Sequence, residues 1–223
     1  MNDDSLCAGK QGSYHVFALA DGEILRPGGQ VASETAIRCL RDEIRDAPGR
    51  PPATILAGAL LRADNEIRLE SKKSGEREGM STRLSACIID SDLVCTVLDT
   101  GEGGCYFIGS DGIHIPGELV PHGMKAGSGI RAAGDWGGCG KMLSHTLGAP
   151  RILQESDIMT TSLRGSSLLL NSGGLHDFVK KEEILEIVTR DRDDLEAACE
   201  SLVHRALADG SDHTISVILV RGD

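Results

Sequence analysis

Three turns, widely separated along the chain, each adjoin an apolar stretch that is typical of a buried strand. Residues 14–20 run into Asp21-Gly22, residues 167–172 run into Gly173-Gly174, and a turn ending in Asp212 precedes an apolar closing strand over 214–220. Carboxylates at the ends of adjacent buried strands can build a site for Mg²⁺ or Mn²⁺, because these hard cations prefer several oxygen ligands on a rigid backbone. Where a third carboxylate would complete the set, the chain has Gly173.

Length and composition restrict the classes of protein to which the chain can belong. Its 223 residues suffice for one domain, over 1–223, with a sizeable core. Aromatic residues make up 3% and the formal net charge is −11, so no nucleic-acid partner is expected. No apolar run approaches the roughly 20 residues that span a bilayer, and the acidic start is unlike a secretory signal. We therefore expect a cytoplasmic protein without a membrane partner.

The number and spacing of the cysteines are consistent with the expected cytoplasmic location. There are seven, and none forms a C-x-x-C pair. Four of them, Cys39, Cys87, Cys95 and Cys199, fall on apolar faces of predicted helices or strands. Because their spacing does not match a zinc site, we interpret them as free thiols that act as small hydrophobic side chains in a reducing compartment.

The apolar periodicity predicts four helices, arranged in two pairs between runs of strands. Helices are expected over about 31–46, 53–73, 181–189 and 193–208, and strands over 84–89, 93–98 and 105–108. A glycine-rich surface loop or flap is expected over 116–141, and a short helix over 141–147. Paired helices between runs of strands favour an α+β domain built in layers rather than an alternating βαβ fold.

Six short motifs, in order along nearly the whole chain, resemble those of the metal-dependent (PPM-type, phosphatase 2C-like) protein serine/threonine phosphatases. This family includes the stage II sporulation E phosphatases. The first motif, which contains the V-A-D-G turn of the family, resembles residues 19–33 with Asp21-Gly22 at the turn, and the other five matching segments are 80–84, 101–106, 143–148, 169–177 and 210–215. The resemblance implies a four-layer α-β-β-α sandwich, with two mainly antiparallel sheets flanked by helix pairs.

The same resemblance implies a two-metal site for Mn²⁺ or Mg²⁺. The ions would activate a water that attacks the phosphorus of phosphoserine or phosphothreonine in a phosphoprotein substrate. Asp21 would bridge the two ions and the Gly22 carbonyl would ligate one of them, while Asp212 would ligate the other; Asp21 and Asp212 are the expected catalytic residues. Further metal ligands are expected from Asp4, Asp3 and Glu102.

The chain also departs from the motifs that it resembles. Gly173 replaces an aspartate that would share an ion with Asp212, so that ion is expected to bind weakly. Arg83 takes the place of a threonine, and Glu23–Arg26 replaces a glycine-rich stretch at the entrance. The arginine that the family carries before its first acidic segment, to grip the phosphate, has no counterpart before Asp3.

Two functions therefore remain open from the sequence. The first is a metal-dependent protein phosphatase with weakened activity, which the retention of Asp21, Gly22 and Asp212 favours. The alternative is a catalytically degenerate pseudophosphatase, which keeps the fold as a module that binds a regulatory protein partner. Gly173, the missing arginine and the altered entrance favour this alternative.

Overall fold

The structure is a computed structural model that describes residues 2–24, 26–46, 48–73, 75–101, 104–116, 146–149 and 158–223. Its elements, in chain order, are β1 (Asp4–Gln11), β2 (Tyr14–Gly22), α1 (Gly29–Asp46), α2 (Pro52–Lys73), the 3-10 turn η1 (Gly75–Arg77), β3 (Thr82–Ile89), β4 (Val94–Asp99), β5 (Cys105–Gly109), β6 (Gly112–His114), β7 (Ile158–Ser162), β8 (Ser167–Asn171), α3 (Gly173–His176), α4 (Lys181–Arg190), α5 (Leu195–Ala208) and β9 (Val217–Arg221).

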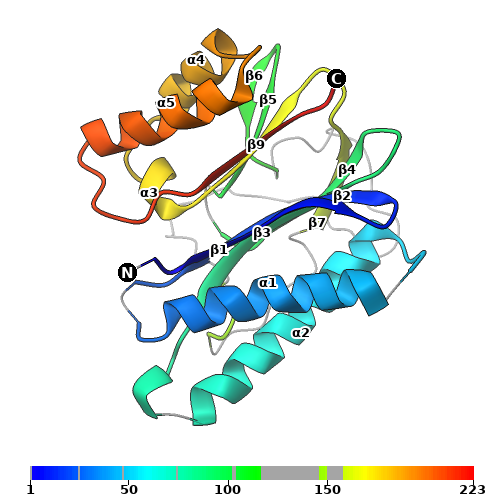
Figure 1. The fold of residues 1–223 in the computed structure, drawn as a ribbon, viewed down its shortest axis with the longest axis vertical. Coiled ribbons are helices and arrows are strands. Elements are labelled where there is room, and N and C mark those ends of the chain that lie inside the picture. Colours follow the sequence, from blue (N-terminus) through cyan, green and yellow to red (C-terminus); the bar gives the residue numbers. More distant parts are fainter. Residues whose placement is uncertain are drawn as a thin grey trace, which may run out of the picture.

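The strands form two sheets that pack face to face. One sheet has the order β1-β2-β3-β4-β7 and the other has the order β6-β5-β8-β9, and the pairs between these strands are antiparallel. Helices α1 and α2 cover the outer face of the first sheet, and α4 and α5 cover that of the second (Figure 1). The α+β, four-layer sandwich with two antiparallel sheets is therefore confirmed.

Alternation along the strands separates the core layers. On β2, Val16, Ala18 and Ala20 pack against the helices, whereas Phe17 and Leu19 face the other sheet, as the two-residue period of a strand requires. Continuing this alternation puts the next odd position, 21, on the side that faces the second sheet. The strand thus delivers Asp21 to the end of the layer between the sheets.

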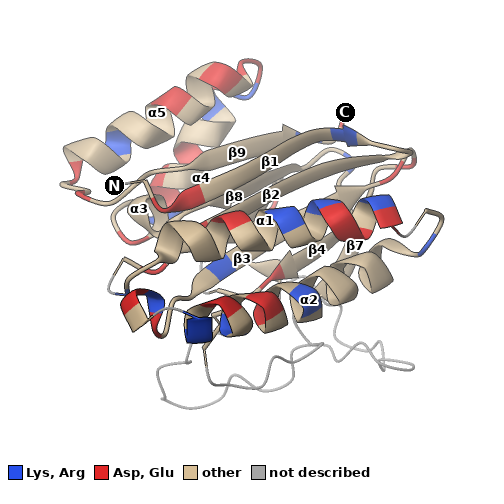
Figure 2. Ribbon diagram, turned by 60° about the horizontal axis from the view of Figure 1, so that its bottom comes forward, with Lys and Arg blue, Asp and Glu red and all other residues tan. Residues whose placement is uncertain are grey.

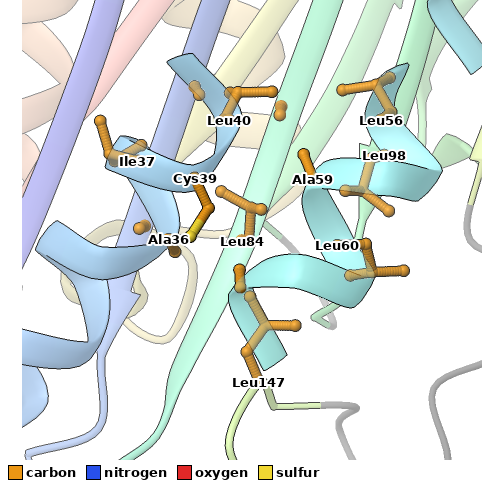
Figure 3. Close-up of a cluster of buried hydrophobic side chains, with 14 of the residues drawn as sticks. Ala36, Ile37, Cys39, Leu40, Leu56, Ala59, Leu60, Leu84, Leu98 and Leu147 are labelled. Atoms are coloured by element: carbon orange, nitrogen blue, oxygen red, sulfur yellow. The ribbon is translucent and has the colours of Figure 1, made fainter. Parts of the chain in front are cut away.

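The layer between the helix pair α1–α2 and the first sheet anchors these strands. Figure 3 shows Leu40 of α1 and Leu56 of α2 close to Leu84 of β3, and each of these side chains is fully buried. Burying one leucine contributes about 1.5–3 kcal/mol. Positive and negative residues both lie along α1 and α2 (Figure 2). The exposed ion pairs between these helices, such as Arg38 to Glu66 at 2.6 Å, contribute only about 0–1 kcal/mol each. Apolar packing therefore holds the strand ends that bear the site.

The structure adds to and adjusts the elements expected from the sequence. The four long helices and the strands β3, β4 and β5 are confirmed, while β1, β7 and α3 were not predicted. The closing strand begins at Val217 rather than at residue 214. Residues 117–141 of the expected flap and 141–145 of the expected short helix lie outside the described residues. Leu147, at the end of that segment, forms a bridge with Thr82. In the described part of the chain, no helix has the length and apolar character needed to cross a bilayer.

Candidate functional site

Three charged residues lie side by side across the ends of β1, β2 and β3. Asp4 is directly opposite Asp21 on the neighbouring strand, and Asp21 is directly opposite Arg83 on the next. Directly opposed residues in an antiparallel pair have Cβ atoms about 4.5–5.5 Å apart, so their side chains interact. We call Asp4, Asp21 and Arg83 the cross-strand row.

The row lies on the side of the first sheet that faces the second sheet. Neighbouring residues show this, because Cys7 on β1 and Leu84 on β3 belong to the helix-facing layer, whereas Leu19 and Cys87 belong to the layer between the sheets. Side chains alternate along each strand, so positions 4, 21 and 83 share the face opposite to that of Cys7 and Leu84.

Two donors converge on one oxygen of Asp21. The Arg83 Nη2 atom and the main-chain nitrogen of Gly173 lie 3.0 and 2.9 Å from Asp21 Oδ2, respectively. The Asp21 side chain is 13% exposed and that of Arg83 is 26% exposed. A hydrogen bond between a guanidinium and a carboxylate is charge-assisted and stronger than a neutral one, particularly where water is partly excluded. These two contacts fix the orientation of the Asp21 carboxylate.

Asp4 carries a buried oxygen that lacks a partner. Its Oδ2 atom makes no hydrogen bond within the described residues. Burial is the main cause that raises the pKa of Asp4 from 3.8 to about 6; the nearby negative charge of Asp21 adds to it, and the Ser216 and Ser172 hydroxyls partly offset it. Partial burial and a neighbouring carboxylate both disfavour the charged form of Asp4. A divalent cation between the two would remove that penalty.

Gly173 lies at the first position of α3, where the second sheet approaches the row. A Cβ atom added at this position would meet Arg83 Nη2 at 3.1 Å, Asp177 Oδ2 at 3.2 Å and Asp21 Oδ2 at 3.4 Å. The space that a side chain at position 173 would use therefore adjoins the guanidinium of Arg83.

The end of β8 is tied to the segment that leads into β9. The Ser172 hydroxyl donates to the Thr214 carbonyl at 3.0 Å and accepts from the Ser216 main-chain nitrogen at 2.9 Å. The Ser172 side chain is buried, so these bonds are shielded from water. They fix the end of β8, which Gly173 follows directly, relative to the start of β9.

The structure brings some of the sequence-predicted residues together and not others. Asp4, Asp21 and Gly22 adjoin at the strand ends, and the Asp3 carbonyl accepts a hydrogen bond from the Gly22 nitrogen at 3.2 Å. The Asp212 side chain is 85% exposed, and its carboxylate lies 3.5 Å from His213 Nε2 rather than in the row. Glu102 lies outside the described residues. Asp3, Asp4, Asp21, Gly22, Asp212 and Glu102 as metal ligands therefore remain predictions.

Two neighbours of this site, Arg83 and Asp99, were not predicted from the sequence. Arg83 stood out only as a replacement for threonine, and strand register is what sets it against Asp21. Asp99, at the end of β4, is opposite Ser85 and accepts a hydrogen bond from its hydroxyl at 2.8 Å. In the pairing of β2 with β3, odd-numbered positions lie opposite odd-numbered positions. Knowledge of this pairing would therefore have placed Arg83 opposite Asp21.

The donor set fits one divalent cation better than two. Asp4, with its unpartnered Oδ2, and Asp21 could hold one ion together with the Gly22 carbonyl. Beside Gly173, the described residues do not provide a comparable set of oxygen ligands for a second ion, because Arg83 already bonds to Asp21 and the Asp212 side chain is exposed. Among the same residues, His, Cys, Asp and Glu side chains form no group of three or more that could hold a metal ion. The second position of a two-metal site therefore does not fit these residues.

Comparisons with known proteins identify solved structures that share this fold. No family model matches the chain, and no curated protein matches it. Among solved structures, the serine/threonine phosphatase Stp1 from Staphylococcus aureus is 19% identical, with a TM-score of 0.78, over 100% of this chain and 90% of that one. The S. agalactiae serine/threonine phosphatase is 21% identical, with a TM-score of 0.76, over 100% of this chain and 94% of that one.

A third structure shows a relative of this fold with bound metal. The catalytic domain of the serine/threonine protein phosphatase PstP, in complex with two manganese ions, is 20% identical, with a TM-score of 0.71, over 98% of this chain and 90% of that one. At these identities the likeness establishes a shared fold. The chain has the fold of bacterial serine/threonine phosphatases over almost its entire length, as the sequence motifs implied.

Proposed function

We propose that this chain is a metal-dependent phosphatase with weakened activity, which hydrolyses phosphoserine or phosphothreonine in protein substrates. The observation that carries the proposal is the pairing of Asp4 with Asp21 at adjacent strand ends, with a buried Asp4 oxygen that lacks a partner. Further support comes from the PstP catalytic domain, which has the same fold and was solved with two manganese ions. Mn²⁺ or Mg²⁺ is the proposed cofactor, because both prefer carboxylate and carbonyl oxygens.

Each residue of the site has a separate role in this proposal. Asp4, Asp21 and the Gly22 carbonyl would hold a divalent ion, which when bound acidifies a water and offsets the charge of a phosphate group. Arg83 and the Gly173 nitrogen keep the Asp21 carboxylate in one orientation through the bonds to Oδ2. Preorganised groups of this kind favour a reaction because they need not rearrange during it. Activity would be weak because the carboxylate missing at Gly173 leaves the site short of ligands.

A second candidate function is a pseudophosphatase that binds a regulatory protein partner without turnover. The specific observation that favours it is the Arg83–Asp21 pair, together with the 85% exposed side chain of Asp212. A carboxylate that is bound to a guanidinium is less available to a metal. In this case the same surface would bind a phosphorylated protein and release it unchanged.

We also propose that residues 1–223 act as one domain in the reducing cytoplasm. Support for the location comes from the thiols of Cys87, Cys95 and Cys105, which are fully buried in the layer between the sheets. Burial raises the pKa of Cys87 and of Cys105 well above the usual range, so these thiols resist the ionisation that precedes oxidation.

Hydrolysis of a phosphoserine peptide by the purified chain, across a Mn²⁺ titration, tests the proposal. Turnover should rise with Mn²⁺, stop on addition of EDTA, and be lost in Asp21→Asn. The matched control is Asp92→Asn, which changes an exposed carboxylate in the β3–β4 turn and should leave turnover unchanged. Binding of the peptide without turnover would favour the pseudophosphatase, and turnover that survives EDTA would contradict the metal mechanism.

A further inference from the structure

We infer that the guanidinium of Arg83 is a built-in cation that takes the place of the second metal ion, and that Gly173 provides the room for it. The inference rests on the proposed function, since it assumes that the first ion binds at Asp4 and Asp21. It assigns a joint role to two residues that lie far apart in the sequence and that each depart from the phosphatase motifs which the chain resembles.

The position of the guanidinium is the first observation. Arg83 Nη2 lies 3.0 Å from Asp21 Oδ2, and Asp21 is the carboxylate expected to bridge two ions. A Cβ atom built on Gly173 would be 3.1 Å from the same nitrogen and 3.2 Å from Asp177 Oδ2. The guanidinium nitrogen therefore lies next to the Asp21 carboxylate and next to the position from which a carboxylate at residue 173 would project, as a bound cation would.

Two glycines make room for the Arg83 side chain. A Cβ atom on Gly101 would lie 2.9 Å from Arg83 Cδ, which is closer than real Cβ atoms approach a neighbour. At the other end of the side chain, Gly173 leaves the space beside Nη2 open and donates its own main-chain hydrogen to Asp21. An aspartate side chain at position 173 would compete with Asp21 for the guanidinium.

Charge explains why the two changes belong together. Removing a carboxylate and adding a guanidinium lets Asp21 be neutralised without a second ion. An arginine remains protonated at all physiological pH values, so this positive charge is permanent. A guanidinium has no vacant coordination position for a water, so it replaces the charge of an ion but not its chemistry. This difference gives a physical reason for weakened activity.

The number of Mn²⁺ ions bound per chain, measured by equilibrium dialysis with metal analysis, tests the inference. The wild type should bind about one ion, and Gly173→Asp should still bind about one, because the introduced carboxylate pairs with Arg83. The double variant Arg83→Thr with Gly173→Asp should bind about one more ion than the wild type. The matched control, Arg83→Thr with Gly173→Ala, lacks the added carboxylate and should bind no additional ion.

The outcomes separate this inference from the proposed function. A double variant that binds no more ions than the wild type overturns the inference, and so does a wild type that binds two. If the wild type binds one ion and the double variant binds no more, the inference fails and the proposed function stands. If the wild type binds none, the metal-dependent function fails, and the inference fails with it because it assumes the first ion.

A measurement on the wild type alone covers the case in which the double variant does not fold. The hydrogens of the Arg83 guanidinium, observed by NMR, should stay protected from exchange with water when Mg²⁺ saturates the protein. Loss of that protection would mean that the metal displaces the guanidinium, and would overturn the inference.

Discussion

Replacing Asp4 by asparagine should stabilise the metal-free protein at neutral pH. The pKa of Asp4 is raised from 3.8 to about 6 in the folded chain, chiefly by burial. A raised folded-state pKa means that folding favours the protonated acid. The stability of the protein is therefore not reduced by Asp4 below about pH 4, and it declines as the pH rises through about 6. At neutral pH the folded chain holds an ionised Asp4 at a cost that asparagine does not have.

The size of the effect follows from the shift. A shift of about two pKa units corresponds to about 3 kcal/mol for a fully buried group. Asp4 is only partly buried, so solvent screening reduces the expected gain in the free energy of unfolding to about 1–2 kcal/mol.

Urea unfolding in EDTA, followed by circular dichroism, measures this gain. Asp4→Asn should be more stable than the wild type at about pH 7, and the difference should vanish near pH 4. The exposed control Asp92→Asn should change stability by less than about 0.5 kcal/mol at either pH. In saturating Mn²⁺ the order should reverse, because only the wild type gains binding energy. A variant that is less stable in EDTA at neutral pH, or a difference that does not change with pH, would refute the reasoning.

Two further predictions concern the residues that support the site. Gly148 has φ +88°, and an added Cβ would clash with an Ile67 methyl group, so Gly148→Ala should destabilise the chain by about 2–4 kcal/mol. Gly12→Ala, at φ +62° with open space around the Cβ, should cost only about 1 kcal/mol, and equal losses in urea unfolding would contradict this. Ser172→Ala removes the two hydrogen bonds of the hydroxyl, which join the end of β8 to the lead-in to β9, and should cost about 1–3 kcal/mol. Exposed Ser91→Ala, its control, should cost nothing measurable; a Ser172 variant as stable as this control would show that the bonds do not hold the two segments together.

The layers of the fold were predictable because they depend on local patterns. Helical spacing marks α1, α2, α4 and α5, and short apolar runs mark β3, β4 and β5. Strand β1 escaped prediction because it is an edge strand in which only Cys7 is fully buried. Its sequence therefore has too few apolar residues to stand out, although it delivers Asp4 to the site.

The site was predictable only in part, because register joins residues that are distant in sequence. The acidic turn after an apolar run pointed to Asp21, and the motifs pointed separately to Gly173 and Arg83. Nothing in the sequence shows that these three meet, since a shift of one residue in the pairing of β2 with β3 would turn Arg83 to the other face. The exposure of the Asp212 side chain could not be predicted from the sequence either, because it depends on how the turn between α5 and β9 projects from the sandwich.

A crystal structure of the wild-type protein grown with Mn²⁺, with anomalous scattering used to locate the metal, addresses the site most directly. One manganese ion should lie between Asp4 and Asp21, with Arg83 still bonded to Asp21 and no ion beside Gly173. Two manganese ions with Arg83 displaced from Asp21, or no ion at Asp4, would contradict a centre that pairs one metal ion with one guanidinium.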